Sequence, residues 1–550
     1  MSVKVIYKDI VPSGKDDISN IETSEINSNI ANTDLLKVEN NQFVHYATLE
    51  KNQWKLDGTY KGLTSNNIGY WSTQVSGDEV TEKTVDDITY NLYEFANEIK
   101  ITRIFENKHT SVGLSFTFAD PDYCNYLNVK WYNDDEKVYD RDFYPNSSQY
   151  YCQQNVEVFN KVEVTFYSMN KANRFLKIFA IDDGVNRTFN DSDIYSITIL
   201  SEMSLISDEL FNHILDLSLK RTEDTEFIFQ KRQPVLVYKD NELDGQFFVE
   251  SSERTSENVY DIQCHNYTGI LESNKFYGGI YFNVLAKDII NEIFTGEQIK
   301  VNIDEDTANT VLSGYIPITT KREALSQVLF ACCSVCDTMR TTEFNIFKLA
   351  DTTTEISADR IFMDGSVKTT DKVTSVVITA HSYTVANESS EVYKGNVFTG
   401  LNTIEFSNPV DTSTVSVSGA TLVNCYNNYC IVNAISDIEI TITGKIYNDN
   451  TSTKQMIDDN VILGTTSNEL SITDATLVSG LNVDKVLLNV FNHALLNSTL
   501  ECDMVFEDEK IGDSVVLHTE WSGDKTGRIE QMEYDIRSKK IGKVVQRISG

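Results

Sequence analysis

Apolar residues recur at helical spacing in the middle of this chain. One wide apolar stripe covers residues 284–294, and a second follows Lys321. Thr320 and Glu323 have the spacing of a capping box, in which each side chain can satisfy a free amide of a helix's first turn. The pattern predicts a helix near 284–294, another over 321–336 and a strand at Glu343–Phe347. The apolar residues of the two stripes are Leu285, Ala286, Ile289, Ile290, Ile293, Phe294, Ala324, Leu325, Val328, Leu329 and Cys332.

Over residues 40–190, apolar and polar positions alternate with the period of two that is typical of strands. Three such runs are Leu114–Phe118, Leu127–Trp131 and Val162–Phe166. Polar clusters rich in aspartate separate the strands, and they predict turns at 119–122, 133–136 and 182–184. Short strands broken by polar turns at this spacing favour a sandwich or a jelly roll.

A second series of strands begins near residue 196. Val235–Tyr238 and Gln246–Glu250 flank a polar segment at 240–245, which predicts a hairpin. Beyond residue 350 the pattern is again mainly that of strands, and one helix is predicted over Val486–Leu496. The predicted fold class is therefore mainly β with a small α/β part.

Acidic residues outnumber basic ones by 82 to 47, which gives a formal net charge of -35. Binding to a nucleic-acid backbone requires clustered Lys and Arg, and the sequence has no such cluster, so we expect no sequence-specific nucleic-acid partner. The acidity fits either plain solubility or a channel lining that repels DNA. No window approaches the roughly 18 apolar residues of a spanning helix, and the N-terminus does not have the pattern of a signal peptide. We expect no transmembrane segment and synthesis in the cytoplasm.

The nine cysteines are scattered and odd in number, which does not favour a disulfide scaffold. Cys333 and Cys336 have the spacing of a zinc-binding pair, and Cys425 with Cys430 could supply a second pair. The first pair falls in a predicted apolar helix, however, where cysteine behaves as a small buried hydrophobe. The seven histidines are dispersed. We therefore expect packing roles for these residues and no metal site.

The sequence contains no phosphate-binding loop, metalloprotease motif, nucleophile elbow or dinucleotide fingerprint. Clustered carboxylates in the predicted turns could hold calcium or cleave a glycoside, but aspartate is also favoured in ordinary turns. We therefore expect no catalytic residue, no cofactor and no enzymatic activity. The carboxylates concerned are Asp120, Asp122, Asp134, Asp135, Glu136, Asp182 and Asp183.

Two passages resemble bacteriophage tail-hub proteins, also called baseplate-hub or tail-tip proteins. They are Gly314–Phe330 and Tyr260–Leu271, the second of which is followed by the predicted helix near 284–294. The resemblance implies two tube-like β-barrels linked by a helical segment and preceded by a jelly-roll module. The implied domains are an N-terminal strand and arm at 1–36, the jelly roll at 37–193, a first barrel at 194–273, a helical segment at 274–350, and a second barrel with a β-rich insertion at 351–550.

The start of the predicted jelly roll resembles a carbohydrate-binding-like module of phage tail proteins. The resemblance rests on Tyr46–Glu50, Trp54–Gly58 and Gly69–Ser72. An aromatic ring can stack on a sugar face, so Trp71, Tyr70 and Trp54 are candidate glycan contacts. The alternative role for any of these rings is packing in the core, which is the role that alternation favours for Trp131.

The family resemblance implies a structural function. Three copies would form a ring at the distal end of a tail tube, match the sixfold tube to a threefold tip and line the DNA channel. The implied partners are the tail-tube and distal tail proteins, the tape-measure protein, a central spike or fibre, and a host cell-wall glycan at the jelly roll. The expected location is the virion tail tip, after assembly in the bacterial cytoplasm. Two alternatives stay open: a carbohydrate-binding surface adhesin, and the hub of a phage-tail-like contractile injection system.

Overall fold

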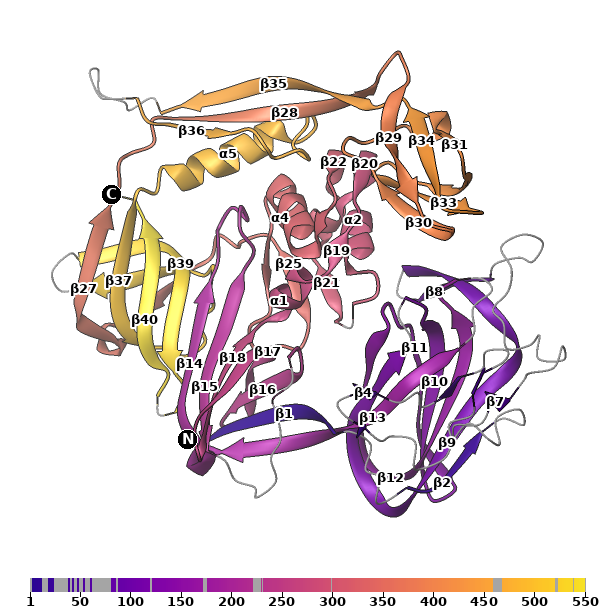
Figure 1. The fold of residues 1–550 in the computed structure, drawn as a ribbon. Helices are drawn as coiled ribbons and strands as arrows, with labels where there is room; N and C mark the ends of the chain where they lie inside the picture. The colour runs from indigo at the N-terminus through magenta and orange to yellow at the C-terminus, as the bar shows by residue number, and fades with distance from the viewer. Residues whose placement is uncertain are drawn as a thin grey trace.

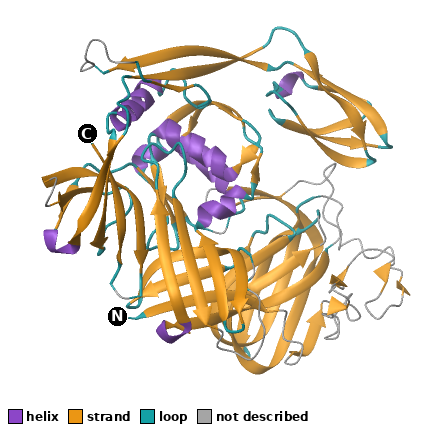
Figure 2. Cartoon of the chain, turned by 60° about the vertical axis from the view of Figure 1, so that its left-hand side comes forward, coloured by secondary structure: helices purple, strands orange, loops and turns teal. Residues whose placement is uncertain are grey.

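Figure 1 shows the fold of the chain in a computed structural model. The structure describes residues 2–11, 18–23, 38–39, 42–43, 47–48, 53–54, 60–61, 81–85, 88–118, 121–171, 176–220, 229, 231–297, 299–458, 467–519, 523–537 and 539–549. Strands dominate these residues, and the few helices gather in the middle of the described chain and near its end (Figure 2). The predicted mainly-β fold class is confirmed.

Residues 81–190 form a β-module around a core of their own, in which Trp131 is fully buried. The long strand β9 pairs with both β12 and β13, and β10 lies between β11 and β12. The predicted turn at 133–136 is confirmed as the β10–β11 hairpin. The predicted turn at 182–184 is wrong, because these residues continue β13 and pair with β9 and β1. The strands are β8 (Thr81–Val85), β9 (Ile88–Phe118), β10 (Cys124–Asn133), β11 (Glu136–Phe143), β12 (Gln149–Met169) and β13 (Lys177–Asn190).

The N-terminal strand β1 (Val3–Val11) connects this module to the rest of the molecule. One edge of β1 pairs with β13, where Val11 faces Asp183, and the other edge pairs with β16. Tyr7 is fully buried in the main core of the protein. The N-terminal strand is therefore an integral part of the sheet that follows the module.

A five-stranded unit follows, which we call unit 1. Its strands are paired in the order β14-β15-β18-β17-β16. The predicted hairpin is confirmed, and its turn is the pair Asp240 and Asn241 with φ of 50° and 70°. Two successive positive φ values are typical of a type I′ turn, which fits the twist of a two-residue hairpin. The strands are β14 (Ile194–Glu202), β15 (Asn212–Lys220), β16 (Pro234–Lys239), β17 (Glu242–Ser256) and β18 (Val259–His265).

The helical segment follows unit 1. The predicted helices are α2 (Ala286–Phe294) and α4 (Lys321–Cys332), and the predicted strand is β25 (Phe344–Phe347). The Thr320 hydroxyl accepts a 3.1 Å hydrogen bond from the Glu323 amide, which confirms the N-terminal cap. The other elements are α1 (Tyr267–Glu272), β19 (Lys275–Phe276), β20 (Gly279–Leu285), β21 (Val301–Ile303), α3 (Glu305–Ala308), β22 (Val311–Ile316), β23 (Thr319–Thr320) and β24 (Val335–Asp337).

The C-terminal end of α4 differs from the prediction. Cys333 has left-handed backbone with φ of 55°, and Ser334 donates its amide hydrogen bond to the Leu329 carbonyl at 3.0 Å. Together with the bond from the Cys333 amide to the Phe330 carbonyl, this is the Schellman arrangement that ends a helix. The helix therefore ends four residues before residue 336, and Cys336 lies in β24.

A second five-stranded unit, unit 2, contains β27 (Ile361–Thr369), β37 (Ser498–Val505), β38 (Ser514–Thr519), β39 (Gly523–Asp535) and β40 (Ile541–Ile548). A short strand, β26 (Thr353–Ile356), adds to β38. Unit 1, the helical segment, unit 2 and β1 all contribute to one continuous hydrophobic core. The domain boundaries at residues 273 and 350 stay predictions.

The insertion between β27 and β37 forms an arm and a small sandwich. β28 (Ser375–Val385) and β35 (Tyr447–Ile457) make a long ribbon, with β36 (Glu469–Ile472) alongside and the predicted third helix as α5 (Val483–Ala494) beneath it (Figure 1). The sandwich has its own core. Its strands are β29 (Ser390–Val397), β30 (Gly400–Glu405), β31 (Ser416–Ser418), β32 (Thr421–Cys425), β33 (Tyr429–Ala434) and β34 (Ile438–Gly444).

Candidate assembly surface

Unit 1 and unit 2 are copies of one strand arrangement. In each unit the first strand pairs with the second, the second with the fifth, the fifth with the fourth, and the fourth with the third. Cross-strand partners therefore line up in matching rows. The row in unit 1 is Ile199, Leu215, Cys264 and Val249. The equivalent row in unit 2 is Val367, Leu500, Gln546 and Ile529.

One irregularity is shared by the two units. The pairing of β17 with β18 shifts register between Val249 and Ser251, and the pairing of β39 with β40 shifts between Ile529 and Gln531. The Arg232 amide bonds the Val249 carbonyl at 2.6 Å, and the Gly512 amide bonds the Ile529 carbonyl at 2.8 Å. A shared bulge fixes the correspondence between β17 and β39 residue by residue, because bulges are specific features of a strand pair. The chain thus carries an internal structural repeat.

The two units are joined edge to edge within the chain. β14 of unit 1 pairs antiparallel with the C-terminal part of β39 in unit 2, from Thr198 opposite Asp535 to Glu202 opposite Gln531 (Figure 1). Ile199 and Tyr534 face each other in the middle of this pairing, and both are buried. The joint is therefore a continuous hydrogen-bonded sheet with apolar packing beneath it.

A buried polar cluster ties the same joint together. Asp244 on β17 is 2% exposed. Its carboxylate accepts a 3.0 Å hydrogen bond from the Tyr534 hydroxyl and forms an ion pair with Lys540. Burial, and then the adjacent Asp244 carboxylate, raises the pKa of Tyr534 well above its ordinary value. The Lys239 ammonium donates to the Ile536 carbonyl at 2.7 Å. These bonds connect unit 1 directly to unit 2.

Ser201 and His213 form a buried pair beside the joint. The two residues are directly opposite on β14 and β15, and the Ser201 Oγ lies 2.7 Å from the His213 Nδ1. Both are fully buried, and burial lowers the pKa of His213 to about 4. The His213 ring also stacks on Phe247, with centroids 4.6 Å apart. A serine–histidine pair with no exposed surface has no access to a substrate, so it packs the core rather than acting as a nucleophile.

Two strand edges are exposed that correspond to the two edges paired in the β14–β39 joint. β27 is the counterpart of β14, and all of Gly365–Thr369 are exposed. The C-terminal part of β17 is the counterpart of the paired part of β39, and all of Ser251–Ser256 are exposed. Among the residues that the structure describes, β27 pairs only with β37, and this part of β17 pairs only with β18. An exposed edge of a sheet is a template for pairing with another chain.

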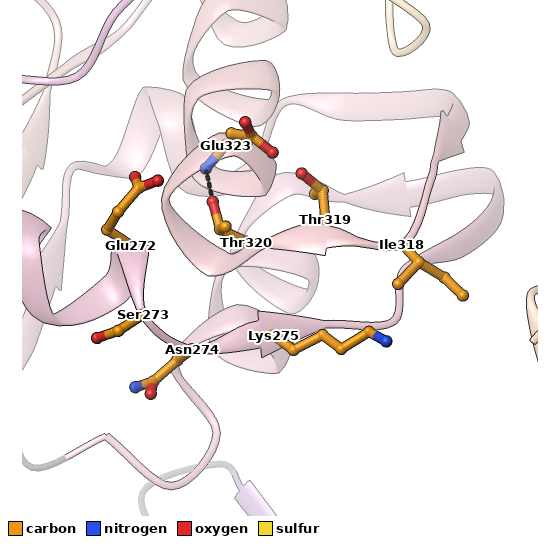
Figure 3. Close-up of a pocket in the computed structure, with 8 residues that line it drawn as sticks. All are labelled: Glu272, Ser273, Asn274, Lys275, Ile318, Thr319, Thr320 and Glu323. Atoms are coloured by element: carbon orange, nitrogen blue, oxygen red, sulfur yellow. Dashed lines mark hydrogen bonds between the residues drawn. The ribbon is translucent and has the colours of Figure 1, made fainter.

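A shallow pocket of about 480 Å³ lies at the start of α4 (Figure 3). The Glu272 and Thr320 side chains line it, and the bond from the Glu323 amide to the Thr320 hydroxyl marks one wall. Its lining residues include no histidine and no cysteine. The lining residues are Glu272, Ser273, Asn274, Lys275, Ile318, Thr319, Thr320 and Glu323.

A buried ion pair lies behind this pocket. The Lys321 ammonium lies 2.6 Å from the Glu297 carboxylate, and their side chains are 10% and 3% exposed. Tyr267 and Asn274 each donate a 2.9 Å hydrogen bond to the same carboxylate. These bonds fasten α1 and the segment after α2 to the first turn of α4, which makes the ion pair a structural element of the helical segment.

The predicted glycan contacts are not located by this structure. Tyr70 and Trp71 lie outside the described residues, and so does the Trp54 side chain, although its backbone belongs to the short strand β6 (Gln53–Trp54). They stay predictions. Among the carboxylates of the predicted turns, Asp120 lies outside the described residues and Asp182 and Asp183 lie in a strand. Asp134 forms a 2.9 Å ion pair with Lys108.

The cysteines with zinc-like spacing are Cys333 with Cys336 and Cys425 with Cys430, and the described part of the chain holds no group of three or more metal-ligating side chains around them. Cys332 and Cys336 are buried in the main core, and burial raises the pKa of each thiol to about 12. A thiol with such a pKa stays protonated near neutral pH and is a poor metal ligand. All nine cysteines are free thiols.

Sequence reasoning missed an apolar tip on the small sandwich. Phe398 and Ile435 are 77% and 93% exposed, in the two loops that meet beside the pairing of Val397 with Ile438. The Thr399 amide and hydroxyl both donate to the Asp437 carboxylate, at 2.8 and 2.9 Å, which holds the loops together. Isolated apolar residues in polar loops gave no periodic signal from which this tip could be predicted.

Within the described residues, no helix combines the length and the apolar character needed to cross a membrane. No protein-family model matches the sequence, and no curated protein shows significant similarity to it.

Three solved structures of similar fold are tail proteins. The 43 kDa tail protein of prophage MuSo2 from Shewanella oneidensis has a TM-score of 0.41 and 11% identity, over 66% of this chain and 94% of that one. The tail protein from Neisseria meningitidis MC58 has a TM-score of 0.42 and 10% identity, over 66% and 94%. Prophage tail protein gp18 from Listeria monocytogenes EGD-e has a TM-score of 0.39 and 10% identity, over 66% and 92%.

Proposed function

We propose that this chain is a structural tail-hub protein of a phage or prophage, and that it has no enzymatic activity. Three copies form a ring at the distal end of the tail tube and line the DNA channel. The observation that carries this proposal is the internal repeat of unit 1 and unit 2, joined edge to edge by β14 and β39.

The repeat explains how one ring can have two symmetries. Each chain supplies two units with the same strand order, so three chains supply six similar units around one axis. The face of the ring toward the tube then presents six similar units, which fits a sixfold tube. The two units of each chain differ in sequence, so the ring as a whole has only threefold symmetry. Closed rings form from heterologous contacts when the rotation between neighbours closes. A sixfold tube can therefore be matched to a threefold tip by a single kind of chain.

The charge of the chain suits a DNA conduit. The net charge of -35 repels a phosphate backbone, so DNA would pass without adhering. The partners proposed for the ring are the tail-tube and distal tail proteins, the tape-measure protein, and a central spike or fibre. The N-terminal β-module, proposed to be a jelly roll, would contact a host cell-wall glycan or neighbouring tail proteins.

The location of the protein in intact particles tests this function. Antibodies against the chain, labelled with gold, should mark one end of the tail tube, opposite the capsid if one is present. Label spread over a cell surface would instead support a carbohydrate-binding adhesin. Label at the end of a capsid-free contractile particle would assign the same hub role to an injection system.

A further inference from the structure

Each chain contains one edge-to-edge pairing between unit 1 and unit 2. The counterpart of this pairing, with the roles of the two units exchanged, is not formed among the described residues. β14 of unit 1 is paired with β39 of unit 2, but β27, the counterpart of β14, has no such partner among the described residues. The C-terminal part of β17, the counterpart of the paired part of β39, pairs there only with β18. We propose that β27 of one copy pairs antiparallel with Ser251–Arg254 on β17 of the next copy, and that this contact closes the ring. The inference rests on the proposed function.

The internal repeat fixes the register of this contact. The matched rows make Val367 the counterpart of Ile199, because each lies opposite the equivalent leucine, Leu500 or Leu215. The shared bulge makes Ser251 the counterpart of Gln531, so Ser251–Arg254 corresponds to Gln531–Tyr534, and the correspondence ends at a second register shift of β17 between Arg254 and Ser256. The joint inside the chain places Ile199 opposite Tyr534 and Leu200 opposite Glu533. Transferred to the contact between copies, this register places Val367 opposite Arg254 and Lys368 opposite Glu253.

The exposed residues of the two edges are complementary in this register. Lys368 and Glu253 carry opposite charges and would form a directly opposite cross-strand pair, which stabilises an antiparallel sheet. Serine and threonine occupy most of the other positions, at 369, 370, 251 and 252, and they can pair across strands by hydrogen bonds. A register shifted by one residue would place Lys368 opposite Ser252 or Arg254 and lose the ion pair.

The contact is heterologous, because a β27 edge meets a β17 edge and not a second β27 edge. Each copy therefore offers one edge of each kind, and every edge is satisfied only in a closed ring. Closing the ring removes the exposed edges that would otherwise promote uncontrolled association.

Disulfide trapping in the full-length protein tests the register. Two in-register double variants are Thr370→Cys with Ser251→Cys, and Thr369→Cys with Ser252→Cys. The two pairs differ in hydrogen-bonding type, so one of them has the close Cα spacing of roughly 4.5 Å that suits a disulfide. The matched control is Ser366→Cys with Ser251→Cys, which is four residues out of register. The four single variants control for the native thiols.

After mild oxidation, at least one in-register pair should give a covalent trimer on a non-reducing gel, and the product should disappear on reduction. The control pair and the single variants should remain monomeric on the same gel. A trimer seen by mass photometry that yields no in-register product, or equal product from the control pair, would overturn this inference and leave the proposed function standing. A wild-type protein that forms no ring at any concentration would overturn the proposed function itself.

Charge exchange provides a second readout that needs no cysteine. Lys368→Glu or Glu253→Lys alone should shift the trimer toward monomer, because like charges then face each other. The double variant should restore the trimer. Equal trimer fractions in all four proteins would contradict the register.

Discussion

Tyr534 on β39 donates a 3.0 Å hydrogen bond to the buried Asp244 carboxylate on β17. This bond connects two units whose strands lie almost three hundred residues apart in the sequence, and Lys540 pairs with the same carboxylate. The two units therefore fold as one body with a fixed relative orientation. A fixed orientation is what a ring built from repeated units requires, because the angle between neighbours decides how many copies close it.

Removing this carboxylate should be costly. Asp244→Ala leaves the Tyr534 hydroxyl, which is buried, and Lys540, whose side chain is 15% exposed, without their partner, so we expect a loss of about 3–5 kcal/mol in unfolding free energy. Tyr534→Phe removes one hydrogen bond to a charged group and should cost about 1.5–3 kcal/mol. Chemical denaturation followed by tyrosine and tryptophan fluorescence would measure both. Equal, small losses would show that the cluster does not hold the units together.

The apolar face of α4 should be essential for stability. Leu325 is fully buried in the main core, so Leu325→Ala should cost about 2–5 kcal/mol through lost burial and a residual cavity. Leu488 on α5 is 49% exposed and provides a matched control, for which Leu488→Ala should change stability by about 0.5 kcal/mol or less. Scanning calorimetry would compare the two. Similar shifts for both variants would contradict the buried position of α4.

Acid should destabilise the protein through two histidines, His213, which is fully buried, and His493, which is partly buried. Burial lowers the pKa of His213 and of His493 to about 4, from an ordinary value of 6.5. Between these values the unfolded chain binds protons that the folded chain does not, so each histidine lowers stability as the pH falls from 6.5 toward 4. The full contribution of each is roughly 3 kcal/mol, reached below pH 4. Above pH 6.5 neither histidine contributes a pH dependence.

The test is the slope of unfolding free energy against pH between 6.5 and 4. The His213→Gln variant lacks the titrating imidazole. Its unfolding free energy should therefore change less steeply with pH than that of the wild type, by the equivalent of up to one bound proton. His518→Gln is the control, because His518 is solvent-exposed with a pKa raised by its bonds to Asp524 and Glu355, and it should leave the slope from His213 in place. An unchanged slope in His213→Gln would contradict the buried neutral histidine.

The N-terminal β-module should be dispensable for assembly, while β1 should not. Val11 of β1 lies directly opposite Asp183 of β13, so a two-residue Asn-Gly turn can replace residues 12–182. The shortened chain should still form trimers by mass photometry. A chain that begins at residue 194 also loses β1, whose Val3, Val5 and Tyr7 lie in the main core, and it should be much less stable. Loss of trimers in the first variant would place the assembly contacts in the module.

Local signals in the sequence were sufficient for the elements that short-range chemistry determines. Thr320 caps α4 as predicted, because the bond to the Glu323 amide lies within one turn of helix. The hairpin at Asp240 was predictable for the same reason. The end of α4 was not, because Cys333 adopts left-handed backbone without the glycine that usually signals it.

Elements that depend on distant pairing could not be predicted from the sequence. Asp182 and Asp183 have turn chemistry, yet their pairing with β9 and β1 holds them in a strand. The internal repeat was hidden for a similar reason: equivalent positions can carry unlike residues, as Cys264 and Gln546 illustrate, and residues 370–497 interrupt unit 2. The exposed strand edges became visible only when the two units could be compared.

Cryo-electron microscopy of the purified protein tests the central claim most directly. We expect a closed ring of three copies with threefold symmetry, in which six five-stranded units repeat at close to sixfold spacing around a central channel. The joint between neighbouring copies should pair β27 of one copy with β17 of the next, in the same way that β14 pairs with β39 within each copy. A monomer, or a closed assembly in which unit 1 and unit 2 do not alternate around one axis, would contradict the account.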